Sequence, residues 1–181
     1  AAELLWLCYE KNKRGPEAEE AYKMLAHYPN ADGKNSLYSR LRVFINLHKL
    51  YNKKNNKVDS ISMLLQADSL INDVDYSDLK LASSVIELRR LQGNMAFDQG
   101  HTQEGIRYYL EACDLSRKCD TVYLLTESLK SISDQIKWLH VNSSQIFALS
   151  LYNTITSWIR KYSLENLSTD IQNCQYLFEQ I

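Results

Sequence analysis

Apolar side chains recur every three or four residues along most of this chain, and no segment alternates strictly between apolar and polar residues. In the segment 35–54 the apolar positions are Leu37, Leu41, Phe44, Leu47, Leu50 and Tyr51. This spacing puts apolar side chains on one face of an α-helix, where they can pack against a neighbouring helix. The pattern predicts an all-α fold.

The periodic segments predict nine helices joined by short turns. Their predicted ranges are 2–13, 16–28, 35–54, 58–72, 76–99, 102–118, 121–141, 144–162 and 165–180. Among the start signals, Asp59 or Asp75 is expected to cap a helix, and Thr102 stands two residues ahead of Glu104 at another helix start. No linker rich in proline, serine or glycine divides the chain, so we expect a single domain over 1–181.

The stretch from Leu91 to Leu115 has the most specific pattern in the sequence. Gly93 and Gly105 fall where two antiparallel helices would cross closely, and Gly100 falls in the turn between them. Apolar and small residues follow at helical spacing, at Tyr108, Tyr109, Ala112 and Leu115. This order of residues resembles a tetratricopeptide repeat, a helical hairpin that stacks into solenoids.

The same order of residues recurs along the chain. The small residues of successive second helices align at Ala18, Ser60, Gly105 and Ala148, which gives intervals of 42, 45 and 43 residues. A standard tetratricopeptide unit has roughly 34 residues, so the resemblance is to a long-period variant. It implies an α-α superhelix, a solenoid of antiparallel hairpins, with hairpins at 1–30, 34–73, 76–119 and 120–162 and a terminal helix at 165–180.

The sequence departs from the family pattern at two core positions. Gln92 stands where the resemblance expects a leucine, and Ala96 stands where it expects an aromatic residue. At the other end of the chain, the ninth helix has no sequential partner for its apolar residues, which include Leu177 and Phe178. We therefore expect that the chain is part of a longer protein, or that it self-associates through this helix.

The resemblance also implies where a partner would bind, because the first helix of each hairpin lines the concave face of such solenoids. The positions that it places on this face are Arg42, Ile45, Lys49, Asn52, Lys53, Glu87, Arg90, Asn94, Phe97 and Asp98. Arg90 and Asn94, one helical turn apart, resemble half of a site that holds a peptide carboxylate. The expected partner-binding residues are Arg42, Lys49, Lys53, Arg90, Asn94 and Phe97.

The sequence offers no motif for catalysis, for a metal ion or for a cofactor. The histidines His27, His48, His101 and His140 are scattered, and there is neither an HExxH nor a CxxC spacing nor a glycine-rich phosphate loop. The four cysteines, Cys8, Cys113, Cys119 and Cys174, show no disulfide spacing, and a six-residue separation on one helix is too long for a bridge. We expect a protein that is not an enzyme, and free thiols that favour the cytoplasm over the periplasm.

Two function classes fit these observations. The first is a scaffold that binds a protein or peptide, in the input region of a bacterial signalling or transcription-regulatory protein, as the long-period resemblance implies. The alternative is a helical-repeat module that binds nucleic acid, which the net charge of −1 does not favour. No run of about 18 apolar residues is present, so no membrane span is expected within the sequence.

Overall fold

The computed structural model describes residues 15–27, 33–71 and 76–120, together with the isolated positions 128, 149, 152, 153, 156 and 157. Its helices are α2 (Gly15–His27), α3 (Gly33–Lys53), α4 (Lys57–Ser69), α5 (Leu79–Asp98) and α6 (Thr102–Lys118). No strand occurs in this part of the chain, so the all-α prediction is confirmed for it. The predicted helices 2–13, 121–141, 144–162 and 165–180, with Leu177 and Phe178, lie outside these three ranges.

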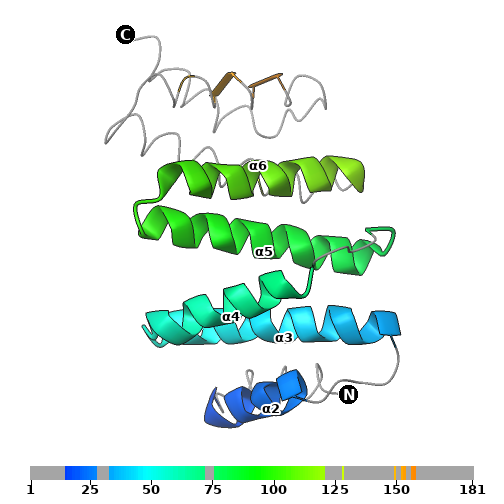
Figure 1. Cartoon of the computed structure of the whole chain (residues 1–181), viewed down its shortest axis with the longest axis vertical. Helices are drawn as coiled ribbons and strands as arrows, with labels where there is room; N and C mark the ends of the chain where they lie inside the picture. The colour runs from blue at the N-terminus through cyan, green and yellow to red at the C-terminus, as the bar shows by residue number, and fades with distance from the viewer. Residues whose placement is uncertain are drawn as a thin grey trace.

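The helices stack in chain order along the long axis of the molecule (Figure 1). Helix α3 reverses into α4 and α5 reverses into α6, so each pair forms an antiparallel hairpin, and α3 and α5 run in the same direction. Helix α3 contacts α2, α4 and α5, while α5 also contacts α4 and α6. The contacts of α5 with α3 and with α4 therefore join the two hairpins.

The turns that close the two hairpins have the same construction, 45 residues apart. Asn55 and Gly100 adopt left-handed backbone conformations, with φ of 58° and 80°. The amide of the next residue then reaches back to the helix: Asn56 N donates to the Tyr51 carbonyl at 2.9 Å, and His101 N donates to the Ala96 carbonyl at 2.8 Å. This 6→1 bond is typical of a helix C-terminus closed by a left-handed residue.

Two of the predicted helix starts require correction, and a third is as predicted. Asn56, rather than Asp59, caps α4: its side chain accepts from Asp59 N at 3.3 Å and donates to the Asp59 carboxylate at 2.6 Å. Helix α5 begins at Leu79, three residues later than predicted, because the Asp78 carboxylate accepts from the amides of the first turn. Helix α6 begins at Thr102 as predicted, but its N-cap His101 makes no side-chain capping bond.

Apolar side chains from α3, α4, α5 and α6 form the main core. Its buried members include Leu41, Ile45, Leu64, Val85, Ile86, Leu88 and Ala112. Ile45 of α3 was expected on the concave face. It is instead fully buried, because its side chain is part of the core formed with the neighbouring helices. A smaller cluster, Tyr22, Val43, Leu47 and Tyr51, packs α2 against α3.

Gly93 and Gly105 lie where α5 and α6 approach each other closely, as predicted. A Cβ atom on Gly105 would lie 2.7 Å from two ring carbons of Phe97 and 3.1 Å from the carbonyl oxygen of Gly93. A Cβ atom on Gly93 would lie 3.0 Å from the ring of Tyr109, which is fully buried. Phe97 and Tyr109 stack on each other with ring centroids 5.6 Å apart, so the two glycines and the two rings form one packed unit.

Gln92 is buried even though it replaces a core leucine of the family pattern, because Arg89 supplies its hydrogen bond. Arg89 Nη1 donates to Gln92 Oε1 at 2.7 Å and to Asp68 of α4 at 2.5 Å, while Nε lies 3.0 Å from Glu111 of α6. The guanidinium thus joins α4, α5 and α6 and satisfies the buried amide oxygen. The second departure, Ala96, is also buried.

Helix α2 is joined to α3 by a carboxylate with two cationic partners. Glu19 lies 2.7 Å from Lys23 and 2.5 Å from Lys54, and it accepts a hydrogen bond from the Tyr51 hydroxyl at 3.2 Å. The hydrogen bonds with Lys23 and Lys54 lower the pKa of Glu19 from 4.5 to about 2. Glu19 is therefore ionised at neutral pH and links the two helices electrostatically.

Candidate functional site: the α3–α5 face

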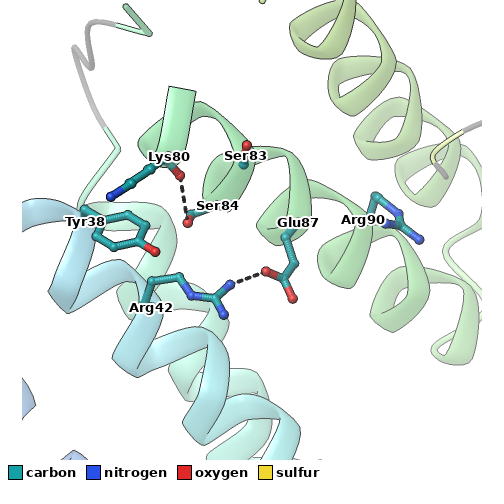
Figure 2. Close-up of a pocket in the computed structure, with 7 residues that line it drawn as sticks. All are labelled: Tyr38, Arg42, Lys80, Ser83, Ser84, Glu87 and Arg90. Atoms are coloured by element: carbon teal, nitrogen blue, oxygen red, sulfur yellow. Dashed lines mark hydrogen bonds and ion pairs between the residues drawn. The ribbon is translucent and has the colours of Figure 1, made fainter. Parts of the chain in front are cut away.

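A cavity of about 300 Å³ opens between the N-terminal halves of α3 and α5. Helix α3 contributes Tyr38 and Arg42, and α5 contributes Lys80, Ser83, Ser84, Glu87 and Arg90. Figure 2 shows these side chains around the space between the two helices. Because they recur every three or four residues along each helix, they lie on the facing sides of α3 and α5. We call this space the α3–α5 cavity.

Glu87 connects the two walls of the α3–α5 cavity. Its carboxylate accepts hydrogen bonds from Arg42 Nη1 and from Lys49 Nζ, both on α3 (Figure 2 shows the Arg42 bond). Burial alone would raise the pKa of Glu87, but the bond to Lys49 and the charges of Lys49 and Arg42 outweigh it and lower the pKa. Glu87 is thus an anion that holds α3 and α5 together.

Cations outnumber anions in the lining of the α3–α5 cavity. The lining contains the cations Arg42, Lys80 and Arg90 and the single carboxylate of Glu87, which accepts a hydrogen bond from Arg42. Nη2 of Arg42 has no hydrogen-bond partner among the described residues, because Nη1 alone bonds Glu87. The hydroxyls of Ser83 and Ser84 donate to carbonyls of their own helix, so the donors left for an incoming anion include Arg42 Nη2 and the Lys80 ammonium.

A second pocket of about 90 Å³ lies farther along the same two helices. Helices α3 and α4 contribute His48, Asn52, Lys57, Ser60 and Ile61, and α5 and its C-cap contribute Leu91, Asn94, Met95, Asp98 and Gln99. Its lining is mostly amide and apolar, with one lysine and one aspartate. We call this space the second pocket.

His48 is the buried polar group of the second pocket. Its Nδ1 lies 2.9 Å from Ser60 Oγ and 3.1 Å from the Ser60 carbonyl oxygen. Burial lowers the pKa of His48, and the bond to the Ser60 carbonyl only partly opposes this effect. His48 is therefore neutral at pH 7 and adds no charge to the pocket.

The expected partner-binding residues occupy different places. Arg42 and Arg90 line the α3–α5 cavity, and Lys49 bonds Glu87 beside it. Asn94 lines the second pocket, where its side chain also accepts a hydrogen bond from the Tyr109 hydroxyl. Lys53 is exposed and has no ion-pair partner in the described part of the chain.

Phe97 differs from the other expected residues because its ring packs within its own hairpin. It stacks on Tyr109 and covers Gly105, and it lines neither the α3–α5 cavity nor the second pocket. The bulky ring is held there because Gly105 leaves room for it. The structure therefore gives Phe97 a packing role between α5 and α6.

Sequence reasoning did not identify Tyr38 and Lys80 as members of the site. Both lie near the beginning of a helix, outside the positions that the family resemblance supplies. Helical spacing could have revealed them, because Tyr38 is four residues before Arg42 and Lys80 is seven residues before Glu87. In contrast, Asn52 and Asp98 were expected on the concave face and line the second pocket.

The described residues offer little for metal or thiol chemistry. They contain no cluster of histidine, cysteine and acidic side chains that could hold a metal ion. Cys113 and Cys119 are free thiols, as expected, and burial raises the pKa of both. None of the described helices combines the length and the apolar composition that a membrane-crossing helix needs.

Comparison with known proteins assigns neither a family nor a relative to this chain. No protein-family model matches it, and neither the curated proteins nor the solved structures contain a match.

Proposed function

We propose that this protein is a tetratricopeptide-like α-α superhelical scaffold without enzymatic activity, which binds a peptide segment of a partner protein at the α3–α5 cavity. The recurrence of the hairpin turn after 45 residues supports a repeat architecture, because Asn55 and Gly100 occupy equivalent positions with the same left-handed conformation. The parallel course of α3 and α5 supports a shared binding surface formed by the first helices of successive hairpins.

The observation that carries the proposal is the cationic lining of the α3–α5 cavity. The lining holds three cations and one carboxylate, and Nη2 of Arg42 has no hydrogen-bond partner among the described residues. An acidic side chain or a free carboxylate from a peptide would receive charge-assisted hydrogen bonds there. The cavity volume of about 300 Å³ accommodates one such side chain with its flanking backbone, so an acidic peptide fits the site.

Nucleic-acid binding, the alternative, has less support on this face. Binding to single strands needs aromatic side chains on which bases can stack, together with a cationic groove. Phe97 is packed on Tyr109, and Tyr38 is the single aromatic side chain in the lining of the α3–α5 cavity.

We further propose that the scaffold is the input region of a bacterial signalling or transcription-regulatory protein. This proposal rests on the long repeat period, 45 residues between Ser60 and Gly105, and on its resemblance to repeats in such proteins. The test is the complete reading frame. A kinase core or a DNA-binding domain in the same polypeptide would support the proposal, and an unrelated enzyme domain would contradict it.

Peptide binding can be tested by fluorescence anisotropy with a panel of labelled peptides that each contain one glutamate in a background of alanine and serine. Each peptide is compared with its glutamine counterpart. We expect the glutamate peptides to bind more tightly, with an affinity that falls as salt rises, because the interaction is electrostatic. Equal affinity for both sets would contradict the proposal.

The contribution of the cavity residue Lys80 to peptide binding can be tested against a matched control, Lys118. Lys80 and Lys118 are both exposed and have no ion-pair partner in the described part of the chain, but only Lys80 lines the cavity. Lys80→Ala should weaken the glutamate peptides by about 0.2–1 kcal/mol, the range for exposed ion pairs, and Lys118→Ala should leave them unchanged. Equal losses in both variants would indicate non-specific attraction instead of a site.

A further inference from the structure

One edge of the Arg42 guanidinium has no partner among the described residues. Nη1 donates to Glu87, whereas Nε is buried without a hydrogen-bond partner and Nη2 also has none in the described part of the chain. Nε and Nη2 lie on the same edge of the planar guanidinium, so their N–H groups can hold two oxygen atoms of one anion. A buried N–H group without an acceptor is unfavourable, and a bound anion would remove this cost.

Lys80 provides a second donor, on the other wall of the α3–α5 cavity. It belongs to the first turn of α5, is exposed and has no ion-pair partner among the described residues. Figure 2 shows the side chains of Arg42 and Lys80 on the same side of Glu87. Asp78, the carboxylate that precedes α5, accepts from amides of the first turn and does not line the cavity. The Arg42 edge and the Lys80 ammonium are therefore donors from two walls of one space.

The charges around the cavity favour an anion with two negative charges. Glu87 accepts from both Arg42 and Lys49. Together with Lys80, these side chains carry three positive charges and one negative charge, a net charge of +2. Arg90, one helical turn beyond Glu87, adds a further cation to the lining. A carboxylate would balance half of the net charge, whereas a phosphomonoester carries about −1.5 to −2 at pH 7.

A phosphomonoester also has the number of oxygen atoms that the donors require. A carboxylate has two oxygens, and the Nε–Nη2 edge of Arg42 would use both. A phosphoryl group has three terminal oxygens, so two can accept from Arg42 while the third accepts from Lys80. We infer that the α3–α5 cavity binds a phosphorylated serine of the partner peptide and prefers it to an acidic side chain. This inference rests on the proposed peptide-binding function and names the side chain that the site recognises.

Fluorescence anisotropy with the full chain tests this preference. Three labelled peptides carry phosphoserine, glutamate or glutamine at one position of the same alanine background. We expect the phosphoserine peptide to bind about three- to thirtyfold more tightly than the glutamate peptide, the gain from one or two further ion pairs. Equal affinity of the phosphoserine and glutamate peptides would overturn the inference.

The dependence on pH distinguishes a dianion from a monoanion. The second pKa of a phosphomonoester is about 6, so the dianionic fraction rises from roughly a quarter at pH 5.5 to nearly all at pH 7.5. Histidine is the side chain that ordinarily titrates in this range, and the lining of the cavity contains none. The affinity for the phosphoserine peptide should therefore rise about two- to fourfold between these pH values, while that for the glutamate peptide stays constant. A parallel response of both peptides would contradict binding of the dianion.

The role of Lys80 can be tested through the ratio of the two affinities. Lys80→Ala should lower the preference for phosphoserine over glutamate, because the third phosphoryl oxygen loses its donor. Lys118→Ala removes an exposed lysine of α6 that does not line the cavity, and it should leave the preference unchanged. An unchanged preference in Lys80→Ala would overturn the assignment of the third oxygen.

The outcomes distinguish the inference from the function on which it rests. If glutamate peptides bind no better than glutamine peptides, the proposed function fails. If glutamate peptides bind better than glutamine peptides but phosphoserine peptides bind no better than glutamate peptides, the inference is wrong and the proposed function stands. Inorganic phosphate is the last probe: if it displaces the labelled peptide at the same concentration as unlabelled phosphoserine peptide, the cavity binds free phosphate and recognition of a phosphorylated peptide is overturned.

Discussion

Replacing Gly105 by alanine should destabilise the protein, although alanine favours helices. Inside a helix, alanine is more stable than glycine by about 1 kcal/mol. The new Cβ atom would lie 2.7 Å from two ring carbons of Phe97, well inside the 3.5–4.0 Å of a favourable carbon contact. The ring must therefore move by roughly 1 Å, and overpacking of this kind costs about 1–3 kcal/mol. We expect a net loss of about 1 kcal/mol in the free energy of unfolding.

The surrounding residues explain why the ring cannot move freely. Phe97 stacks on Tyr109, which is fully buried with its ring close to Gly93. The carbonyl of Gly93, only 3.1 Å from the new Cβ, blocks a shift of α6 toward α5. Relaxation therefore has to separate the two helices.

The assay is urea denaturation followed by circular dichroism, with an exposed position of the same helix as control. Asp114 is exposed on α6, so the difference between Asp114→Gly and Asp114→Ala measures helix propensity alone, and alanine should be more stable there. At position 105 the order should reverse. In a Phe97→Ala background the reversal should disappear, with a coupling energy of about 1–3 kcal/mol. If Gly105→Ala stabilises the protein as much as alanine does at position 114, the close crossing is wrong.

Three further predictions concern other parts of the molecule. Arg89→Met should lower the free energy of unfolding, measured by urea denaturation, by about 1–3 kcal/mol, because it leaves the buried amide oxygen of Gln92 unpaired. The control Arg107→Met removes an exposed ion pair and should change this free energy by under about 1 kcal/mol, so equal effects would contradict the role of Arg89. The lowered pKa of Glu19 contributes stability above pH 4.5, and this stability is lost as the pH falls toward about 2. Glu19→Gln should therefore flatten the dependence of the unfolding free energy on pH between these values, and an unchanged slope would contradict the ion pairs of Glu19. In a variant with Cys8 and Cys174 replaced by serine, an alkylating reagent should label the partly exposed Cys119 in the native protein and the buried Cys113 only after unfolding, as measured by mass spectrometry. Equal labelling rates of the two thiols in the native protein would contradict the burial of Cys113.

The helices could be predicted from sequence because their signals are local. Helix α6 begins and ends where the pattern places it, since Gly100 fixes the preceding turn and the apolar spacing continues to Leu115. The cap of α4 was missed because Asn56 and Asp59 bond each other, and either residue type is a good cap. Asp78 was missed because Tyr76 and Ser77 carry no strong breaker signal, although both precede the helix.

The candidate site was harder to predict because it depends on how separate helices meet. The resemblance placed Arg42 and Arg90 on first helices, and the structure brings both to one cavity. It could not reveal that Glu87 bonds Lys49 and Arg42, because such a bridge depends on the register between α3 and α5. The same reason applies to Phe97, whose place is decided by the space above Gly105 on another helix.

The walls of the α3–α5 cavity belong to different hairpins, and this has a mechanical consequence. A ligand that contacts both walls would fix the angle between α3 and α5, as in domain closure around a ligand. Helix α5 has 20 residues and is about 30 Å long, so a rotation of about 5° would displace its far end by roughly 3 Å. Occupancy of a cavity the size of one side chain would thus be transmitted to α6, which packs against α5.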